Sequence, residues 1–143
     1  MAVQSSPVSP HFVTIGKDGN IFVYNYNTHQ LILETRFNSI GTDLLWFSTK
    51  VSSSGYEIMV SFEDGILRQL ALDLKKKPKL NLIRAIKAHT AAITKLSVNP
   101  KQTVFVSGAA DHTVFIYNLR DSDSGFVHLE PQGFVQLNAI PYS

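Results

Sequence analysis

Apolar and polar positions alternate with a period of two along most of the chain, which predicts β-strands. The strand-like runs are rich in β-branched and aromatic residues, and several are joined by short turns that contain Asp and Gly. We expect strands at 11–16, 20–26, 30–37, 43–48, 56–62, 66–72, 80–86, 92–98, 103–109, 114–119 and 126–131. No stretch has a sustained period of 3.6 residues, so an all-β fold class is expected.

Three of the turns carry an aspartate at regular spacing, which indicates an internal repeat. The separation is 46 residues from Asp18 to Asp64 and 47 residues from Asp64 to Asp111. This period lies slightly above the roughly 40–45 residues of a WD repeat, the unit that forms one four-stranded blade of a β-propeller.

The last of the three repeats resembles a WD40 blade in detail. His89 stands where the Gly-His motif of the family places its histidine, with Ala88 in place of glycine, and Tyr117 stands in for tryptophan. In the family, a histidine, an aspartate, a serine and the aromatic residue form a hydrogen-bonded relay. The resemblance implies that the relay of this blade consists of His89, Ser107, Asp111 and Tyr117. We expect it to satisfy polar groups near the blade core.

The other two repeats keep only part of this pattern. Thr14, Asp18 and Tyr24 have the spacing of a partial relay in the first repeat. The middle repeat keeps the Asp64-Gly65 turn, but no histidine precedes it at the right distance, so hydrophobic contacts are expected to replace the relay.

The predicted organisation is a WD40 β-propeller fragment of about three four-stranded blades. Residues 1–10, rich in Ser and Pro, are expected to be a disordered lead-in that lacks the innermost strand, which leaves the first blade incomplete. The propeller segment covers 11–143, with blades at about 11–37, 40–86 and 88–131. Propellers have about four to eight blades, so three are not a closed propeller alone, and we expect a fragment, a truncated isoform or part of a larger propeller.

Composition narrows the possible chemistry. The chain has 143 residues, 44% hydrophobic and 17% charged, which is typical of one globular domain. It has no cysteine, and its five histidines lack the spacing of metal ligands, so neither a metal nor a cofactor is expected.

The first ten residues do not have the pattern of a signal peptide, and no apolar run is long enough for a membrane helix. A formal net charge of +2 is too weak to predict nucleic-acid binding.

The neighbouring Asp111 and His112 raise the question of catalysis, with Ser107 close in sequence. The chain has no Gly-x-Ser-x-Gly nucleophile elbow, and the resemblance already assigns Asp111 to a turn. We therefore expect no catalytic residue, and His112 to be a turn neighbour.

The basic stretch 75–79 is the candidate contact loop. Its lysines could bind an acidic protein surface, a phosphate or a nucleic acid, or they could form a solvated loop beside the outer strand. They are Lys75, Lys76, Lys77 and Lys79. No aromatic residue is interleaved with them, unlike in single-strand binding surfaces.

The middle repeat, at 37–72, also resembles a blade of the large two-propeller WD-repeat proteins of the axoneme. That resemblance implies a non-enzymatic scaffold of the cilium or flagellum that helps to tether an inner dynein arm, for motility and axoneme assembly. The implied partners are a related axonemal WD protein, the dynein arm and doublet microtubule components, without membrane or nucleic acid. The alternative is a WD40 adaptor that binds a phosphopeptide or nucleic acid through the face carrying Lys50, Lys95 and Lys101.

Overall fold

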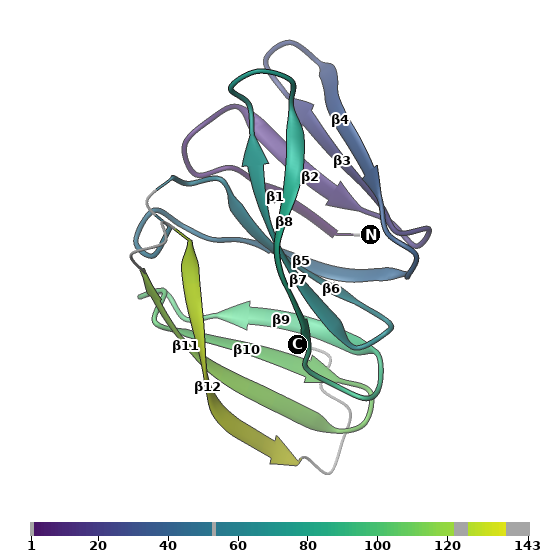
Figure 1. The fold of residues 1–143 in the computed structure, drawn as a ribbon, viewed down its shortest axis with the longest axis vertical. Coiled ribbons are helices and arrows are strands. Elements are labelled where there is room, and N and C mark those ends of the chain that lie inside the picture. The colour runs from purple at the N-terminus through teal and green to yellow at the C-terminus, as the bar shows by residue number, and fades with distance from the viewer. Residues whose placement is uncertain (1, 53, 122–125, 137–143) are drawn as a thin grey trace.

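A computed structural model describes residues 2–52, 54–121 and 126–136, which form three four-stranded antiparallel sheets stacked along the long axis (Figure 1). The first sheet contains β1 (Ala2–Ser5), β2 (His11–Ile15), β3 (Asn20–Asn25) and β4 (Gln30–Arg36). The second contains β5 (Gly41–Trp46), β6 (Glu57–Phe62), β7 (Ile66–Asp73) and β8 (Lys79–Lys87). The third contains β9 (Ile93–Val98), β10 (Val104–Ala109), β11 (Thr113–Asp121) and β12 (Val127–Gln136). The all-β prediction is confirmed, and the described sheets do not form a closed barrel.

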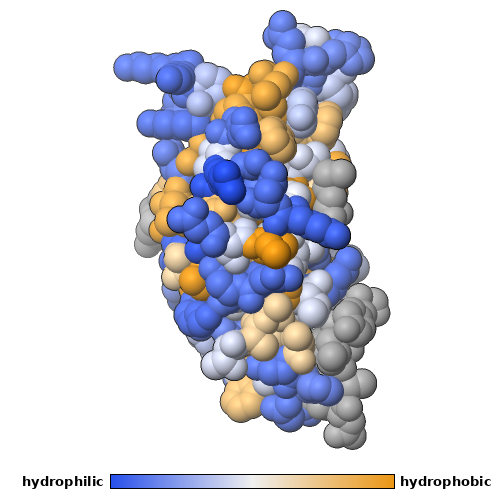
Figure 2. Space-filling model, turned by 90° about the vertical axis from the view of Figure 1, so that its right-hand side faces the viewer, coloured by the Kyte–Doolittle hydropathy of each residue, from blue (hydrophilic) through white to orange (hydrophobic). Residues whose placement is uncertain are grey.

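Each sheet follows chain order, and each strand pairs with the next one through a short connection. Between sheets, β5 lies beside β1 and β9, so the first strands of the three sheets are neighbours. The β2–β3, β6–β7 and β10–β11 turns lie along the right-hand side of the molecule in Figure 1. This side, which faces the viewer in Figure 2, is largely hydrophilic with separate apolar patches.

Two hydrophobic clusters hold the stack together, one on each face of the second sheet. Val13 and Ile15 of β2 pack toward Ile58 and Val60 of β6 in the first cluster. In the second cluster, Met59 of β6 packs with residues of the third sheet. Because side chains alternate between the two faces of a strand, β6 serves both clusters and is buried along its whole length.

The structure corrects the prediction for the first ten residues. Ala2–Ser5 forms β1, which pairs antiparallel with β2, so the first sheet has four strands in the described residues. Only Ala2 packs against the hydrophobic cluster, and the other three residues of β1 are exposed. An edge strand of this kind is held by backbone hydrogen bonds, which require no hydrophobic pattern, and the sequence therefore did not reveal it.

The last strand is also longer than predicted. Val127–Gln136 replaces the expected 126–131, and the strand continues through Pro131 and Gly133. Pro131 is tolerated because β12 is an edge strand, and the pairing with β11 shifts at Ile116/Tyr117. Residues 137–143 of the predicted propeller segment lie outside the described residues.

The loop between β5 and β6 folds inward, although its sequence is polar. Val51 and Ser52 are buried, and the indole nitrogen of Trp46 donates a hydrogen bond to the Gly55 carbonyl at 2.7 Å. Trp46 itself is buried, as its place in an alternating strand predicts.

Candidate functional site

The candidate site of the third sheet begins at the β10–β11 turn, where Asp111 acts as the acceptor. Its carboxylate accepts hydrogen bonds from the backbone and the hydroxyl of Thr113 and, at 3.2 Å, from the hydroxyl of Thr90. Hydrogen bonds from Thr113 are the main reason why the pKa of the Asp111 carboxyl lies below its usual value. His112 has a positive φ of 70° and belongs to the same turn.

His89 lies behind this turn and is almost completely buried. Its Nε2 lies 2.8 Å from the Ser107 hydroxyl, and its Nδ1 lies 2.9 Å from the Thr113 hydroxyl. The ring of Phe115 packs edge-on against the imidazole. The structure therefore brings together His89, Ser107 and the Asp111 turn, with Thr113 standing between the histidine and the aspartate.

The single proton of the Thr113 hydroxyl determines the direction of these hydrogen bonds. Thr113 donates to Asp111, so it must accept from the Nδ1–H of His89. In a neutral imidazole, Nε2 is then the acceptor for the Ser107 hydroxyl. Burial lowers the pKa of His89, which favours this neutral form, although the charge of Asp111 opposes the shift. The hydrogen-bonded series therefore runs from Ser107 through His89 and Thr113 to Asp111.

Tyr117 does not belong to this hydrogen-bonded series. Its ring is buried and lies 5.8 Å from that of Phe105, centroid to centroid. Among the hydrogen bonds of the described residues, none joins its hydroxyl to Ser107. Burial raises the pKa of the Tyr117 hydroxyl. Tyr117 thus supports the third sheet through packing.

The contact between Ser107 and His89 has the spacing of a nucleophile and its general base. However, Ser107 is completely buried beneath the turn, and a substrate in solvent cannot reach its hydroxyl. The geometry therefore favours a structural role for the pair.

In the first sheet, Asp18 caps the β2–β3 turn by accepting hydrogen bonds from the backbone and side chain of Asn20. Tyr24 stacks on Phe12, with ring centroids 5.1 Å apart, and not on the turn. Thr14 pairs with Phe22 in the strand register, and no hydrogen bond of the described residues joins it to Asp18 or Tyr24. The partial relay proposed for these residues is not assembled here.

In the middle sheet, Asp64 accepts a hydrogen bond from the Ile66 backbone at 3.0 Å and lies 3.4 Å from the Arg68 guanidinium. Gly65 has a φ of +80°, and a β-carbon there would lie 2.1 Å from the carbonyl oxygen of His89. The turn of the second sheet is therefore pressed against the loop that enters the third.

One buried polar group between the second and third sheets has no counterpart among the predicted site residues. Glu57 is fully buried and accepts hydrogen bonds from Ser52 at 2.6 Å, from Gln69 at 3.0 Å and from the backbone of Val127 at 2.8 Å. Gln69 also donates to the Val127 carbonyl at 2.9 Å. An acidic residue within an apolar strand is the signal that could have indicated it, since a buried charge needs partners.

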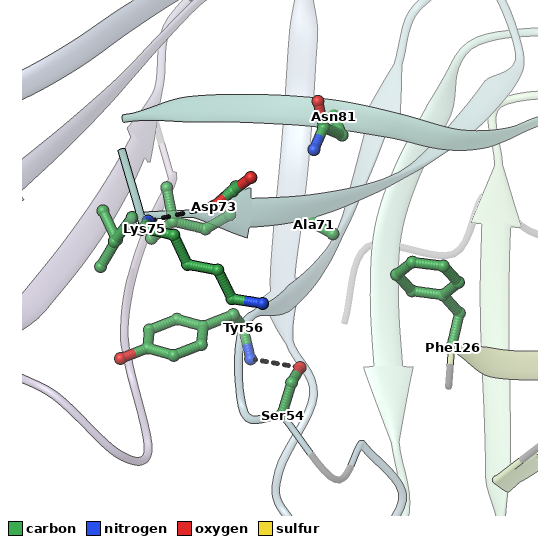
Figure 3. A pocket seen from close by; sticks show the side chains of 9 residues that line it. Ser54, Tyr56, Ala71, Asp73, Lys75, Asn81 and Phe126 are labelled. Carbon is green, nitrogen blue, oxygen red and sulfur yellow. Dashed lines mark hydrogen bonds between the residues drawn. The ribbon is translucent and has the colours of Figure 1, made fainter. Parts of the chain in front are cut away.

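The basic residues of the candidate contact loop are exposed between β7 and β8, and Lys79 begins β8. A cavity of about 500 Å³ lies beside the loop, between the second sheet and Phe126 (Figure 3).

Among the described residues, no group of three or more His, Cys, Asp or Glu could hold a metal ion. None of them forms a helix with the length and apolar character that crossing a membrane requires.

Known proteins resemble the chain in part. Residues 80–118 match the family described as WD domain, G-beta repeat. The chain is 29% identical over 130 residues to cilia- and flagella-associated protein 44 of Mus musculus, in a match that covers 82% of the chain and 7% of that protein. It is 24% identical over 143 residues to WD repeat-containing protein 82 of Drosophila melanogaster, covering 94% of the chain and 43% of that protein. The chain thus spans less than half the length of either relative.

Proposed function

Because the chain carries a WD40 repeat within three blade-like sheets, we propose that it is a non-enzymatic protein-interaction scaffold of the ciliary or flagellar axoneme. In this role it helps to tether an inner dynein arm, and its partners are a related axonemal WD protein, the dynein arm or components of the doublet microtubules. The location within the axoneme rests on the similarity to cilia- and flagella-associated protein 44.

The observation that carries the scaffold proposal is the way in which the sheets are joined. Glu57 of the second sheet accepts a hydrogen bond from the start of β12 in the third, and Gly65 packs against the His89 carbonyl. Asp43 of β5 accepts a hydrogen bond from the Leu96 backbone at 2.9 Å. Contacts of this kind hold the second and third sheets in fixed relative positions, which is what a rigid binding surface requires.

The contacts of the lysines favour the scaffold over an adaptor that binds a charged ligand through Lys50, Lys95 and Lys101. Lys50 donates to the Pro100 carbonyl at 3.2 Å, and Lys95 lies 3.8 Å from the Asp43 carboxylate. Two of the three cations are therefore already engaged within the chain.

Localisation of the tagged full-length protein in ciliated cells tests the proposal. The scaffold predicts a signal along the axoneme and co-purification with dynein-arm or doublet proteins from isolated axonemes. A nuclear signal without an axonemal pool would support the adaptor and contradict the scaffold.

A further inference from the structure

The cavity beside the basic loop combines an apolar floor with a charged rim. Its apolar lining comes from the second sheet and from the residue before β12, and consists of Tyr56, Ala71, Leu72, Leu74 and Phe126. Its volume of about 500 Å³ falls within the range of roughly 300–1,000 Å³ that is usual for ligand pockets. The cavity can therefore accept a bulky apolar group.

Lys75 links this cavity to the basic loop. In Figure 3 its side chain extends beside Tyr56, while the ring of Phe126 stands on the other side of the cavity. The backbone N–H of Lys75 donates to the Asp73 carboxylate at 3.0 Å, which fixes the start of the loop. In this position the ammonium group of Lys75 lies near Tyr56, next to the apolar floor (Figure 3).

The other lysines of the loop extend the same positive rim. Lys75, Lys76, Lys77 and Lys79 are all exposed. Lys50 and Lys95 are exposed too, but Lys50 donates to the Pro100 carbonyl and Lys95 lies beside the Asp43 carboxylate. Among the ion pairs of the described residues, none involves a lysine of this loop. The charge is therefore available to a partner.

We propose that this cavity and the basic loop form a docking site for an acidic peptide segment with an aromatic anchor. The anchor enters the cavity between Tyr56 and Phe126, and carboxylates before or after it face the lysines. The site deepens the proposed scaffold function and rests on it, because it names the class of partner segment that the scaffold binds. An anchor in an apolar pocket with charges at the rim is the usual division of roles in an interface.

A peptide fits the walls of the cavity better than a nucleic acid does. Asp73 lines the cavity and would repel phosphates and peptide carboxylates alike, but a peptide can present a backbone N–H to it, which its carboxylate can accept, whereas a nucleic-acid backbone has no such donor there. Asn81 also lines the cavity and can both donate to and accept from a peptide backbone.

Fluorescence polarisation with the 143-residue chain tests the site. The probe is a labelled glutamate-rich peptide with one central phenylalanine, compared with the same peptide carrying serine there and with an oligothymidylate of equal charge. We expect the phenylalanine peptide to bind about tenfold more tightly than the serine peptide, since an aromatic side chain is buried. Substitution of Lys75, Lys76 and Lys77 by Ala should weaken both peptides by about tenfold, because each exposed ion pair contributes little alone.

Matched variants separate the two parts of the site. Asn81→Trp fills the cavity from an exposed strand position and should remove the preference for phenylalanine, whereas Leu82→Trp, on the other face of the same strand, should not. Lys17→Ala with Lys101→Ala is the charge control away from the loop. Thermal melting establishes that each variant is folded.

Three outcomes would overturn the site: equal binding of the two peptides, affinity unchanged by the loop variants, or tighter binding of the oligonucleotide than of the peptide. If the tagged protein is found in the axoneme but any of these results is obtained, the docking site is wrong and the scaffold function stands. If the protein binds the peptide specifically but is absent from axonemes, the axonemal function is wrong and the docking site stands.

Discussion

The carboxylate of Glu57 accepts a hydrogen bond from the backbone N–H of Val127 at 2.8 Å, although the two residues are 70 positions apart in the sequence. Glu57, a fully buried acid of the second sheet, thereby anchors Val127, the first residue of β12 in the third sheet. Gln69 reinforces this junction by donating to both Glu57 and the Val127 carbonyl.

Removing this acid should loosen the two sheets. Glu57→Ala leaves the Val127 N–H, one N–H of Gln69 and the Ser52 hydroxyl without their acceptor in the core. We expect a loss of roughly 3 kcal/mol in the free energy of unfolding. Glu57→Gln keeps an acceptor oxygen and should lose less. Urea denaturation measures both, with Glu34→Ala on an exposed strand position as control. If the urea midpoint of Glu57→Ala equalled that of the control, Glu57 would not join the two sheets as described.

His89→Ala should destabilise the third sheet by roughly 1–3 kcal/mol, since Ser107 and Thr113 both lose a buried partner. The control is His128→Ala on the partly exposed β12. The relay hypothesis fails if the denaturation midpoint of His89→Ala is unchanged.

The same histidine makes stability depend on pH. Burial holds the pKa of His89 below 6.5 in the folded chain, and burial does the same for His11. Below about pH 6.5 the unfolded chain therefore binds protons that the folded chain does not, and the free energy of unfolding decreases as the pH falls. Urea titrations between pH 7.5 and 5 should show this slope reduced in His89→Gln; a variant with an undiminished slope would exclude His89 as its source.

Energetic coupling between His89 and Asp111 should pass through the Thr113 hydroxyl. A double-mutant cycle of His89→Ala and Asp111→Ala is expected to give a coupling of about 1 kcal/mol. In a Thr113→Val background, which keeps the shape but removes the hydroxyl, the coupling should vanish. Persistence of the full coupling in that background would mean that the two residues interact directly.

Gly65→Ala should be severely destabilising, by roughly 3 kcal/mol or more, because a β-carbon meets the His89 carbonyl oxygen in a left-handed backbone conformation. Gly16→Ala is the matched control, since the nearest atom there is the end of the Asp18 side chain at 3.3 Å. Thermal unfolding compares the two, and equal melting temperatures would contradict the close packing of the turn against His89.

Most of the fold could be predicted because alternation and Asp-containing turns are local features. Of the twelve strands in the described residues, eleven were expected near their observed positions, and β1 was missed. Both sides of β6 are buried, yet its sequence still indicates a strand, because β-branched and apolar residues fit either face.

The site was less predictable because its decisive contacts join residues that are distant in sequence. The resemblance to a WD40 blade implied a relay of His89 and Asp111 but could not show that Thr113 stands between them. The alternating pattern assigned no role to Gln69, yet its side chain donates to the Val127 carbonyl across the sheet junction. The cavity beside Lys75 depends on Phe126 from another sheet, which no local pattern reveals.

The most direct test of the scaffold claim is extraction of the tagged full-length protein from isolated cilia or flagella. A scaffold of the axoneme should stay with the axonemes after the membrane is removed with detergent, and should cross-link there to dynein-arm or doublet proteins. Complete release into the detergent-soluble fraction, without cross-links to axonemal proteins, would contradict the scaffold claim.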